Sequence, residues 1–310
     1  MEEETARLAS NGEPIRRVRA GEISLAYRLW PGRGPAIVGI HGLTASHVNF
    51  IGIAERLAER RPLIAFDLRG RGQSDKPTTG YGMQQHARDI AAAMRGLGLG
   101  RSVVLGHSMG AYIGTALAAE FPALVAGLVM LDGGYLLDPP PGFDPDQLLD
   151  TLLKPQIERL RTTYESRAKY LDFWRALPAI PTTDWGPWVE AYLEYDLGGE
   201  PPSLRARVAE PAVREDFRSM AQKQEVKQRL LAVECPVMVI RAQAGVAPGQ
   251  PPIIPNQVMS EIRECVPSVE EHLITGTTHY TIALADPGAS IVADLVDKFA
   301  ARLNATVISN

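Results

Sequence analysis

The pentapeptide Gly106-His107-Ser108-Met109-Gly110 is the segment of this sequence best suited to chemistry. It follows the apolar run 102–105 and precedes the helix-like segment 111–120. A Gly-x-Ser-x-Gly pattern between a strand and a helix is typical of a nucleophile elbow, a sharp turn that exposes the serine hydroxyl. A serine hydroxyl is a weak nucleophile at neutral pH and needs a base to take its proton. We therefore predict that Ser108 is a nucleophile.

Several apolar runs, each followed by a polar or glycine-rich turn, would position this serine. Continuous runs of this length are typical of buried strands. They occupy residues 36–40, 63–66, 102–105, 128–131 and 237–240, and another short run occupies 272–275. The turns after them contain His41-Gly42, the segment from Asp67 to Asp75, Ser108, Asp132 and, after the last run, His279.

Taken together, these features resemble the α/β-hydrolase family. Four motifs occur in the family's order, namely His-Gly, Asp-x-Arg-Gly-x-Gly-x-Ser, Gly-x-Ser-x-Gly and a late histidine. The resemblance extends over about residues 22–302. It implies an α/β fold with a mostly parallel, eight-stranded sheet flanked by helices and with an inserted helical cap.

The segment between Asp132 and Pro236 is too long for a single crossover, which needs only about a dozen residues. Its residues read mostly as helices, at 145–177, 185–197 and 211–233. In the family a cap is inserted at this point of the chain. The resemblance thus implies a helical cap, or lid, at 135–228 and a hydrolase core made of 1–134 and 229–310.

His279 is the expected general base. Of the six histidines, it alone follows the last predicted strand and precedes a terminal helix, where the family keeps its base. An imidazole suits this task because its pKa lies near the operating pH. The alternative is a surface-loop histidine.

The acid that orients the base departs from the usual family pattern. Most members place an aspartate after the strand predicted at 237–240, but residues 238–259 contain no Asp or Glu. Some α/β hydrolases, including certain dehalogenases and zearalenone-type lactonases, place this acid one strand earlier. Asp132 follows the strand at 128–131, so the resemblance implies that it is the triad acid. The alternative is that Asp132 only caps its turn, and Asp67 is expected to be structural.

The resemblance also implies an oxyanion hole formed by the backbone N–H groups of Leu43 and Met109. The cap is rich in aromatic residues, and Trp185, Trp188 and Tyr192 recur at helical spacing. They either pack inside the cap or roof an apolar substrate pocket, which His47 would also line.

Composition narrows the class of partner. The net charge of −4 argues against nucleic acid, which needs a basic face. No run approaches the roughly 20 apolar residues of a membrane span, and the acidic start Met1–Glu4 does not resemble a signal peptide. We expect a cytoplasmic protein, either a monomer or a dimer, that acts on a small molecule. Cys235 and Cys265 lack metal-site spacing and are expected to be free thiols; no cofactor or metal is expected.

These residues favour hydrolysis of a carboxylic ester or lactone, with an apolar or aromatic substrate. Two alternatives remain open. One is a carbon–carbon bond hydrolase of ring-cleavage products, which uses the same triad. The other is a hydrolase-like small-molecule receptor.

Overall fold

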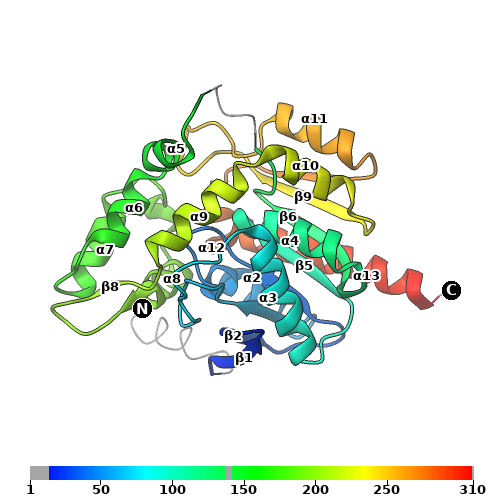
Figure 1. The fold of residues 1–310 in the computed structure, drawn as a ribbon, viewed down its shortest axis with the longest axis horizontal. Helices are drawn as coiled ribbons and strands as arrows, with labels where there is room; N and C mark the ends of the chain where they lie inside the picture. Colours follow the sequence, from blue (N-terminus) through cyan, green and yellow to red (C-terminus); the bar gives the residue numbers. More distant parts are fainter. Residues whose placement is uncertain (1–13, 137–141, 309–310) are drawn as a thin grey trace.

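The computed structural model describes residues 14–136 and 142–308. At its centre lies an eight-stranded sheet with the strand order β1-β2-β4-β3-β5-β6-β9-β10 (Figure 1). The strands are β1 Arg16–Ala20, β2 Ile23–Trp30, β3 Ile37–Ile40, β4 Leu63–Phe66, β5 Ser102–His107, β6 Val125–Leu131, β9 Val237–Ala242 and β10 Glu270–Ile274. β2 is antiparallel to both of its neighbours, β1 and β4. The other six strands of the sheet, β4, β3, β5, β6, β9 and β10, run parallel to one another. The predicted fold class is confirmed.

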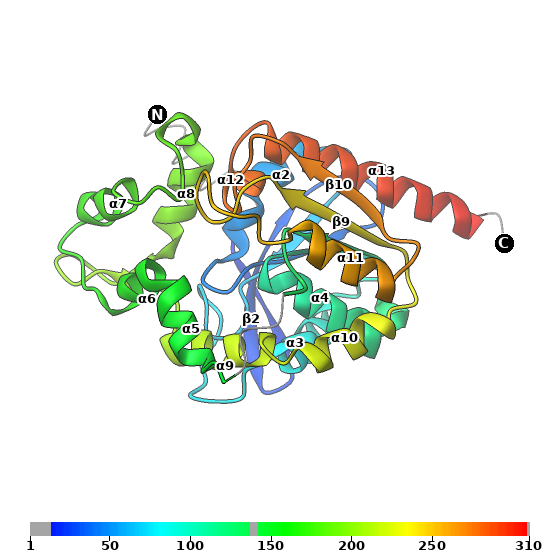
Figure 2. The same ribbon diagram turned by 90° about the horizontal axis from the view of Figure 1, so that it is seen from above.

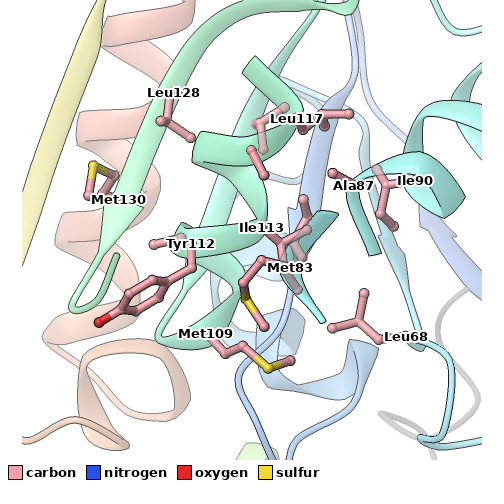
Figure 3. Packing of buried hydrophobic residues seen from close by; sticks show 14 of the residues in the cluster. Leu68, Met83, Ala87, Ile90, Met109, Tyr112, Ile113, Leu117, Leu128 and Met130 are labelled. Atoms are coloured by element: carbon pink, nitrogen blue, oxygen red, sulfur yellow. The ribbon is translucent and has the colours of Figure 1, made fainter. Parts of the chain in front are cut away.

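Helices cover both faces of this sheet. One face carries α3 (Met83–Gly96), α4 (Met109–Glu120), α10 (Lys223–Leu231) and α11 (Asn256–Cys265), whereas the other carries α2 (Ile51–Leu57), α12 (Thr281–Leu284) and α13 (Gly288–Ile308). The central strands are apolar along their whole length because they are buried on both sides. Figure 3 shows α4 packed between α3 and β6, with Ile113 and Leu117 of α4 among the buried side chains of these two elements. This packing fixes the start of α4, where the predicted nucleophile lies.

The segment between β6 and β9 forms helices and one short hairpin. The helices are α5 Pro145–Leu152, α6 Lys154–Arg161, α7 Arg167–Arg175, α8 Pro187–Asp196, α9 Glu210–Met220 and α10; the hairpin pairs β7 Leu197–Gly198 with β8 Arg205–Ala206. Figure 2 shows α5 to α8 gathered beside one end of the sheet, away from the end of α13.

Two of the helices expected in this segment are divided in the structure. The helix expected over 211–233 forms α9 and α10. The helix expected over 145–177 is broken into α5, α6 and α7. Pro155 lies in the first turn of α6, a position that proline tolerates, and it could not continue α5 because it has no N–H. α10 packs on α4 and α11, so the end of this segment rests on the core. The cap boundaries, 135–228, stay a prediction.

Within the described residues, none of the helices has the length and apolar character needed to cross a membrane. The two cysteines are free thiols, Cys265 buried and Cys235 half-buried. Over the same residues, no group of three or more His, Cys, Asp or Glu side chains is placed to hold a metal ion.

Candidate active site

Ser108 lies at the turn between β5 and α4 in a strained backbone conformation, with φ 56° and ψ −120°. Its N–H donates to the carbonyl of Leu131 at 2.9 Å. The turn is so tight that a Cβ on Gly110 would lie 1.8 Å from the carbonyl oxygen of Ile40. Strain of this kind persists where the surroundings enforce it, and here it sets the serine at the carboxyl end of β5.

His279 and Asp132 meet side chain to side chain. The Nδ1 atom of His279 lies 2.7 Å from Oδ2 of Asp132. Oδ1 of the same carboxylate accepts the N–H of Ala242 at 3.0 Å, and the carboxylate is completely buried. Asp132 has a positive φ of 46°, so the chain turns sharply after β6 and points this carboxylate at β9. With Nδ1–H donating to the carboxylate, the Nε2 atom of His279 keeps its lone pair for a proton.

The backbone of His279 is also fixed on both sides. Its N–H donates to the carbonyl of Gly245 at 2.9 Å, and its own carbonyl accepts Nε2–H of His107 at 3.0 Å. Nδ1 of His107 faces the amide of Asn49 at 3.2 Å. Burial lowers the pKa of His107 well below its usual value, so this imidazole is a neutral link between the elbow and the base. The sequence did not predict that Asn49 and His107 link to His279, because these three residues lie far apart in the chain and share no local pattern.

The two predicted oxyanion donors border the serine. Gly42 is so close that a Cβ there would lie 3.1 Å from Cβ of Ser108, which places the start of the loop that contains Leu43 against the elbow. Met109 is the first residue of α4, where backbone N–H groups have no acceptor inside the helix and carry the positive end of its dipole. Both N–H groups are therefore suited to hold a negatively charged oxygen.

A cavity of about 640 Å³ opens over these residues, and Ser108, His279, Gly42 and Leu43 all line it. Most of the rest of its wall is apolar, including Leu148, Leu153, Phe217, Met220, Val246 and Ile253. None of the described residues that line it is Asp, Glu, Lys or Arg. A wall without charged groups suits an uncharged ligand, because an unpaired buried charge is costly.

The residues predicted for the pocket separate in the structure. Tyr192 of α8 lines the cavity, but Trp185 and Trp188 instead line a second cavity of about 490 Å³ between α8 and α2. Trp185 precedes the start of α8 at Pro187, so the expected helical spacing does not apply to it. Nε1 of Trp188 donates to Glu55 of α2 at 2.9 Å.

His47 is likewise absent from the described wall of the larger cavity, because its side chain is bound to Asp67. Asp67 accepts Nδ1–H of His47 at 2.8 Å, N–H of Gln73 at 2.8 Å and the hydroxyl of Tyr195 at 2.5 Å. Burial alone would raise the pKa of Asp67, but its interaction with His47 and these hydrogen bonds hold it below the usual value. The Asp67 carboxylate thus joins α8 to the core, whereas the carboxylate that contacts His279 is that of Asp132.

Comparisons with known proteins agree with this architecture. The family model described as alpha/beta hydrolase fold matches residues 35–286. The 2-(acetamidomethylene)succinate hydrolase of Mesorhizobium japonicum is 41% identical over 127 residues, 41% of this chain and 45% of that protein. The N-formylmaleamate deformylase of Pseudomonas putida is 35% identical over 116 residues, 37% of this chain and 43% of that protein. The chain thus spans less than half the length of these curated relatives.

A solved structure is similar over a longer stretch. The crystal structure of E-2-(acetamidomethylene)succinate hydrolase superposes with a TM-score of 0.76 at 26% identity, covering 92% of this chain and 98% of that one.

Proposed function

Since the chain belongs to the α/β-hydrolase fold family, we propose that it is a serine hydrolase that forms an acyl-enzyme on Ser108. The observation that carries this proposal is the 2.7 Å contact between His279 Nδ1 and Asp132 Oδ2, at a cavity that Ser108 lines. The first-choice reaction is hydrolysis of an uncharged carboxylic ester or lactone.

In this mechanism Nε2 of His279 takes the proton of the Ser108 hydroxyl while Oγ bonds to the acyl carbon. The carbonyl oxygen gains the negative charge, and the N–H groups of Leu43 and Met109 stabilise it. His279 then gives its proton to the leaving alcohol as the acyl carbon–oxygen bond breaks. In the second half of the cycle His279 takes a proton from water, which attacks the acyl carbon. His279 then returns this proton to Ser108 as the ester bond to the serine breaks and the acid is released. The carboxylate of Asp132 stabilises the imidazolium that forms twice in each cycle.

The names of the relatives favour hydrolysis of a bond other than a carboxylic ester. One relative is named for an acetamidomethylene succinate and the other for an N-formylmaleamate, neither of which is a simple carboxylic ester. Hydrolysis of a bond other than an ester, including the carbon–carbon bond of a ring-cleavage product, is therefore our second candidate. Against it stands the uncharged cavity wall, which offers no described Arg or Lys to a substrate carboxylate.

A substrate panel separates the two candidates. We would measure kcat/KM for aryl esters and lactones, for N-acyl enamides, and for dienoic ring-cleavage acids together with their methyl esters. Preference for the neutral esters and lactones supports the first candidate, whereas preference for the free acids or enamides supports the second. Ser108→Ala should abolish turnover of every active substrate, at a cost of about four decades or more. A folded Ser108→Ala variant that keeps turnover would overturn the proposed nucleophile.

The panel also tests the receptor reading. A stoichiometric burst of leaving group without further turnover is the behaviour of a receptor that is acylated once. Steady multiple turnovers identify an enzyme.

A further inference from the structure

Residues 42–44 form a loop beside Ser108 that contains the proposed oxyanion donor Leu43, and we call it the oxyanion loop. Each of its three successive carbonyl groups is held by a buried side chain. The first is that of Gly42, which accepts Nδ1–H of His41 at 2.8 Å and the N–H of Ala45 at 3.3 Å. Because Gly42 C=O and Leu43 N–H belong to one planar peptide unit, this contact directly sets the direction of the Leu43 N–H.

The carbonyl of Leu43 is held by Arg71. Its Nε and Nη2 atoms both donate to this one oxygen, at 3.1 and 3.0 Å. Nη1 of Arg71 lies 2.6 Å from Asp216 of α9, and the same carboxylate contacts His86 at 2.9 Å. Burial favours the neutral form of Asp216, but His86 and Arg71 outweigh it and hold the pKa at about 2. A fully buried, charged guanidinium therefore fixes the loop to α9.

The carbonyl of Thr44 is held by Arg159 of α6, whose Nη2 donates to it at 3.1 Å. Arg159 is completely buried, and its Nη1 bonds to the carboxylate of Asp196 and to the hydroxyl of Tyr170. Burial alone would lower the pKa of Arg159, but Asp196 reverses this and raises it above its usual value. The guanidinium also lies over the ring of Trp174, 5.4 Å from its centroid.

Both arginines thus depend on carboxylates from the segment inserted between β6 and β9, namely Asp196 of α8 and Asp216 of α9. We propose that Arg71 and Arg159 are positioning residues that hold the oxyanion loop, so that docking of the inserted helices keeps the Leu43 N–H in its productive orientation. This inference rests on the proposed function, because it takes Leu43 as an oxyanion donor.

The physical reason is preorganisation. A donor stabilises a developing oxyanion only if it already points at the oxygen, since reorienting it during the reaction costs part of the gain. Two charge-assisted contacts to neighbouring carbonyls are stronger than the same contacts from neutral groups, and they restrict rotation of the peptide units on the far side of Leu43. A lysine cannot reproduce a guanidinium that bonds a carbonyl and a carboxylate at once.

The test uses Arg71→Lys and Arg159→Lys, which keep the positive charge beside Asp216 and Asp196. With an aryl ester that the wild type turns over, we expect kcat to fall about 10- to 100-fold with KM within about threefold. The Ki of an apolar trifluoromethyl ketone, which forms a tetrahedral adduct on the serine, should rise by the same factor as kcat/KM falls.

Arg69→Lys is the matched control. Arg69 lies in the same turn and is buried, and its guanidinium donates to Asp89 at 2.8 Å and to the carbonyl of Gly80 at 2.6 Å. Its backbone carbonyl accepts Nη1–H of Arg71 at 3.0 Å, and the substitution keeps this carbonyl. We expect this variant to lose stability while kcat and the ketone Ki stay at wild-type values. If Arg159→Lys does not fold, Arg159→Met/Asp196→Leu removes both buried charges together and serves in its place.

Two outcomes would overturn the inference. One is a folded Arg71→Lys or Arg159→Lys variant with wild-type kcat, and the other is a kcat loss without a matching change in the ketone Ki. Retained activity in Ser108→Ala is a different result, because it rejects the proposed nucleophile itself.

Discussion

Asp132 and His279 are separated by 147 residues in the sequence, and their side chains lie 2.7 Å apart. The contact forms because β6 and β9 are neighbours in the sheet, so the turn after β6 faces the loops that follow β9 and β10. It uses both carboxylate oxygens, one for the imidazole and one for the N–H of Ala242. With Asp132 in this place, the proposed triad is complete without a carboxylate in the loop after β9.

Asp132→Asn tests the assignment of the acid. The amide keeps the shape of the side chain but removes its charge and favours the wrong tautomer of His279. We therefore expect kcat to fall by about four decades with little change in KM. Steady-state kinetics on the best substrate of the panel measure both constants.

Asp67→Asn is the control for that experiment. Asp67 binds His47, Gln73 and Tyr195, so this substitution should lower the midpoint of urea unfolding. It should lower kcat much less than Asp132→Asn does. If Asp67→Asn removed activity while Asp132→Asn kept it, the two roles would have to be exchanged.

The uncharged cavity wall predicts discrimination against anionic substrates. A half ester of a dicarboxylic acid would bury a carboxylate without a partner, at a cost of about 3 kcal/mol, so its diester should react about 100-fold faster in kcat/KM. Thr151→Arg should narrow this ratio because Thr151 lines the cavity at an exposed position. Thr151→Gln, similar in length but neutral, should not. Equal rates for diester and half ester in the wild type would show that a cation reaches the substrate.

Tyr192 and Trp188 are predicted to act differently although both lie on α8. Tyr192→Ala enlarges the main cavity and should shift the ratio of kcat/KM between long and short acyl groups. Trp188→Ala removes packing on α2 and the bond to Glu55, so it should lower stability by about 2 kcal/mol and leave that ratio unchanged. Measuring both variants on the same two esters decides between pocket and packing roles. A shifted ratio in Trp188→Ala alone would reverse the assignment.

Buried histidines predict a loss of stability in mild acid. Burial lowers the pKa of His41 to about 3, whereas in the unfolded chain it is about 6.5. Between these values the unfolded state binds more protons, so stability falls as the pH is lowered. At pH 5 His41 alone should cost about 2 kcal/mol relative to pH 7.5, and His107 acts in the same direction.

Urea unfolding at pH 7.5, 6 and 5 measures this loss. Asp216, with a pKa of about 2, keeps its full stabilising effect across this pH range, because that effect is lost only as the pH falls below the ordinary aspartate range. A free energy of unfolding that stays constant from pH 7.5 to 5 would contradict the prediction.

The sheet and the turn that carries Ser108 could be predicted because they depend on local patterns. Apolar runs buried on both faces have a clear signature, and the elbow around Ser108 needs small residues at fixed spacing. Asp132 could be named only because residues 238–259 contain no acid.

The remaining features depend on contacts between distant segments. Arg159 reaches the carbonyl of Thr44, 115 residues away, and nothing in either local sequence indicates this. The sequence left open whether Trp188 packs or roofs the pocket, because its spacing shows which face of a helix it shares but not what that face touches. The structure sets it against α2.

The segment from Ala242, the last residue of β9, to Ile253 carries no side chain of the proposed triad. Yet five of its residues line the cavity at Ser108, namely Gly245, Val246, Gln250, Pro251 and Ile253. Its hydrogen bonds to His279 and Asp132 come from the backbone, through the carbonyl of Gly245 and the N–H of Ala242. Side chains here are thus free to change under selection without touching the reacting groups. Random libraries at positions 246, 250 and 253 are a direct route to new substrate ranges, since the proposed triad lies elsewhere.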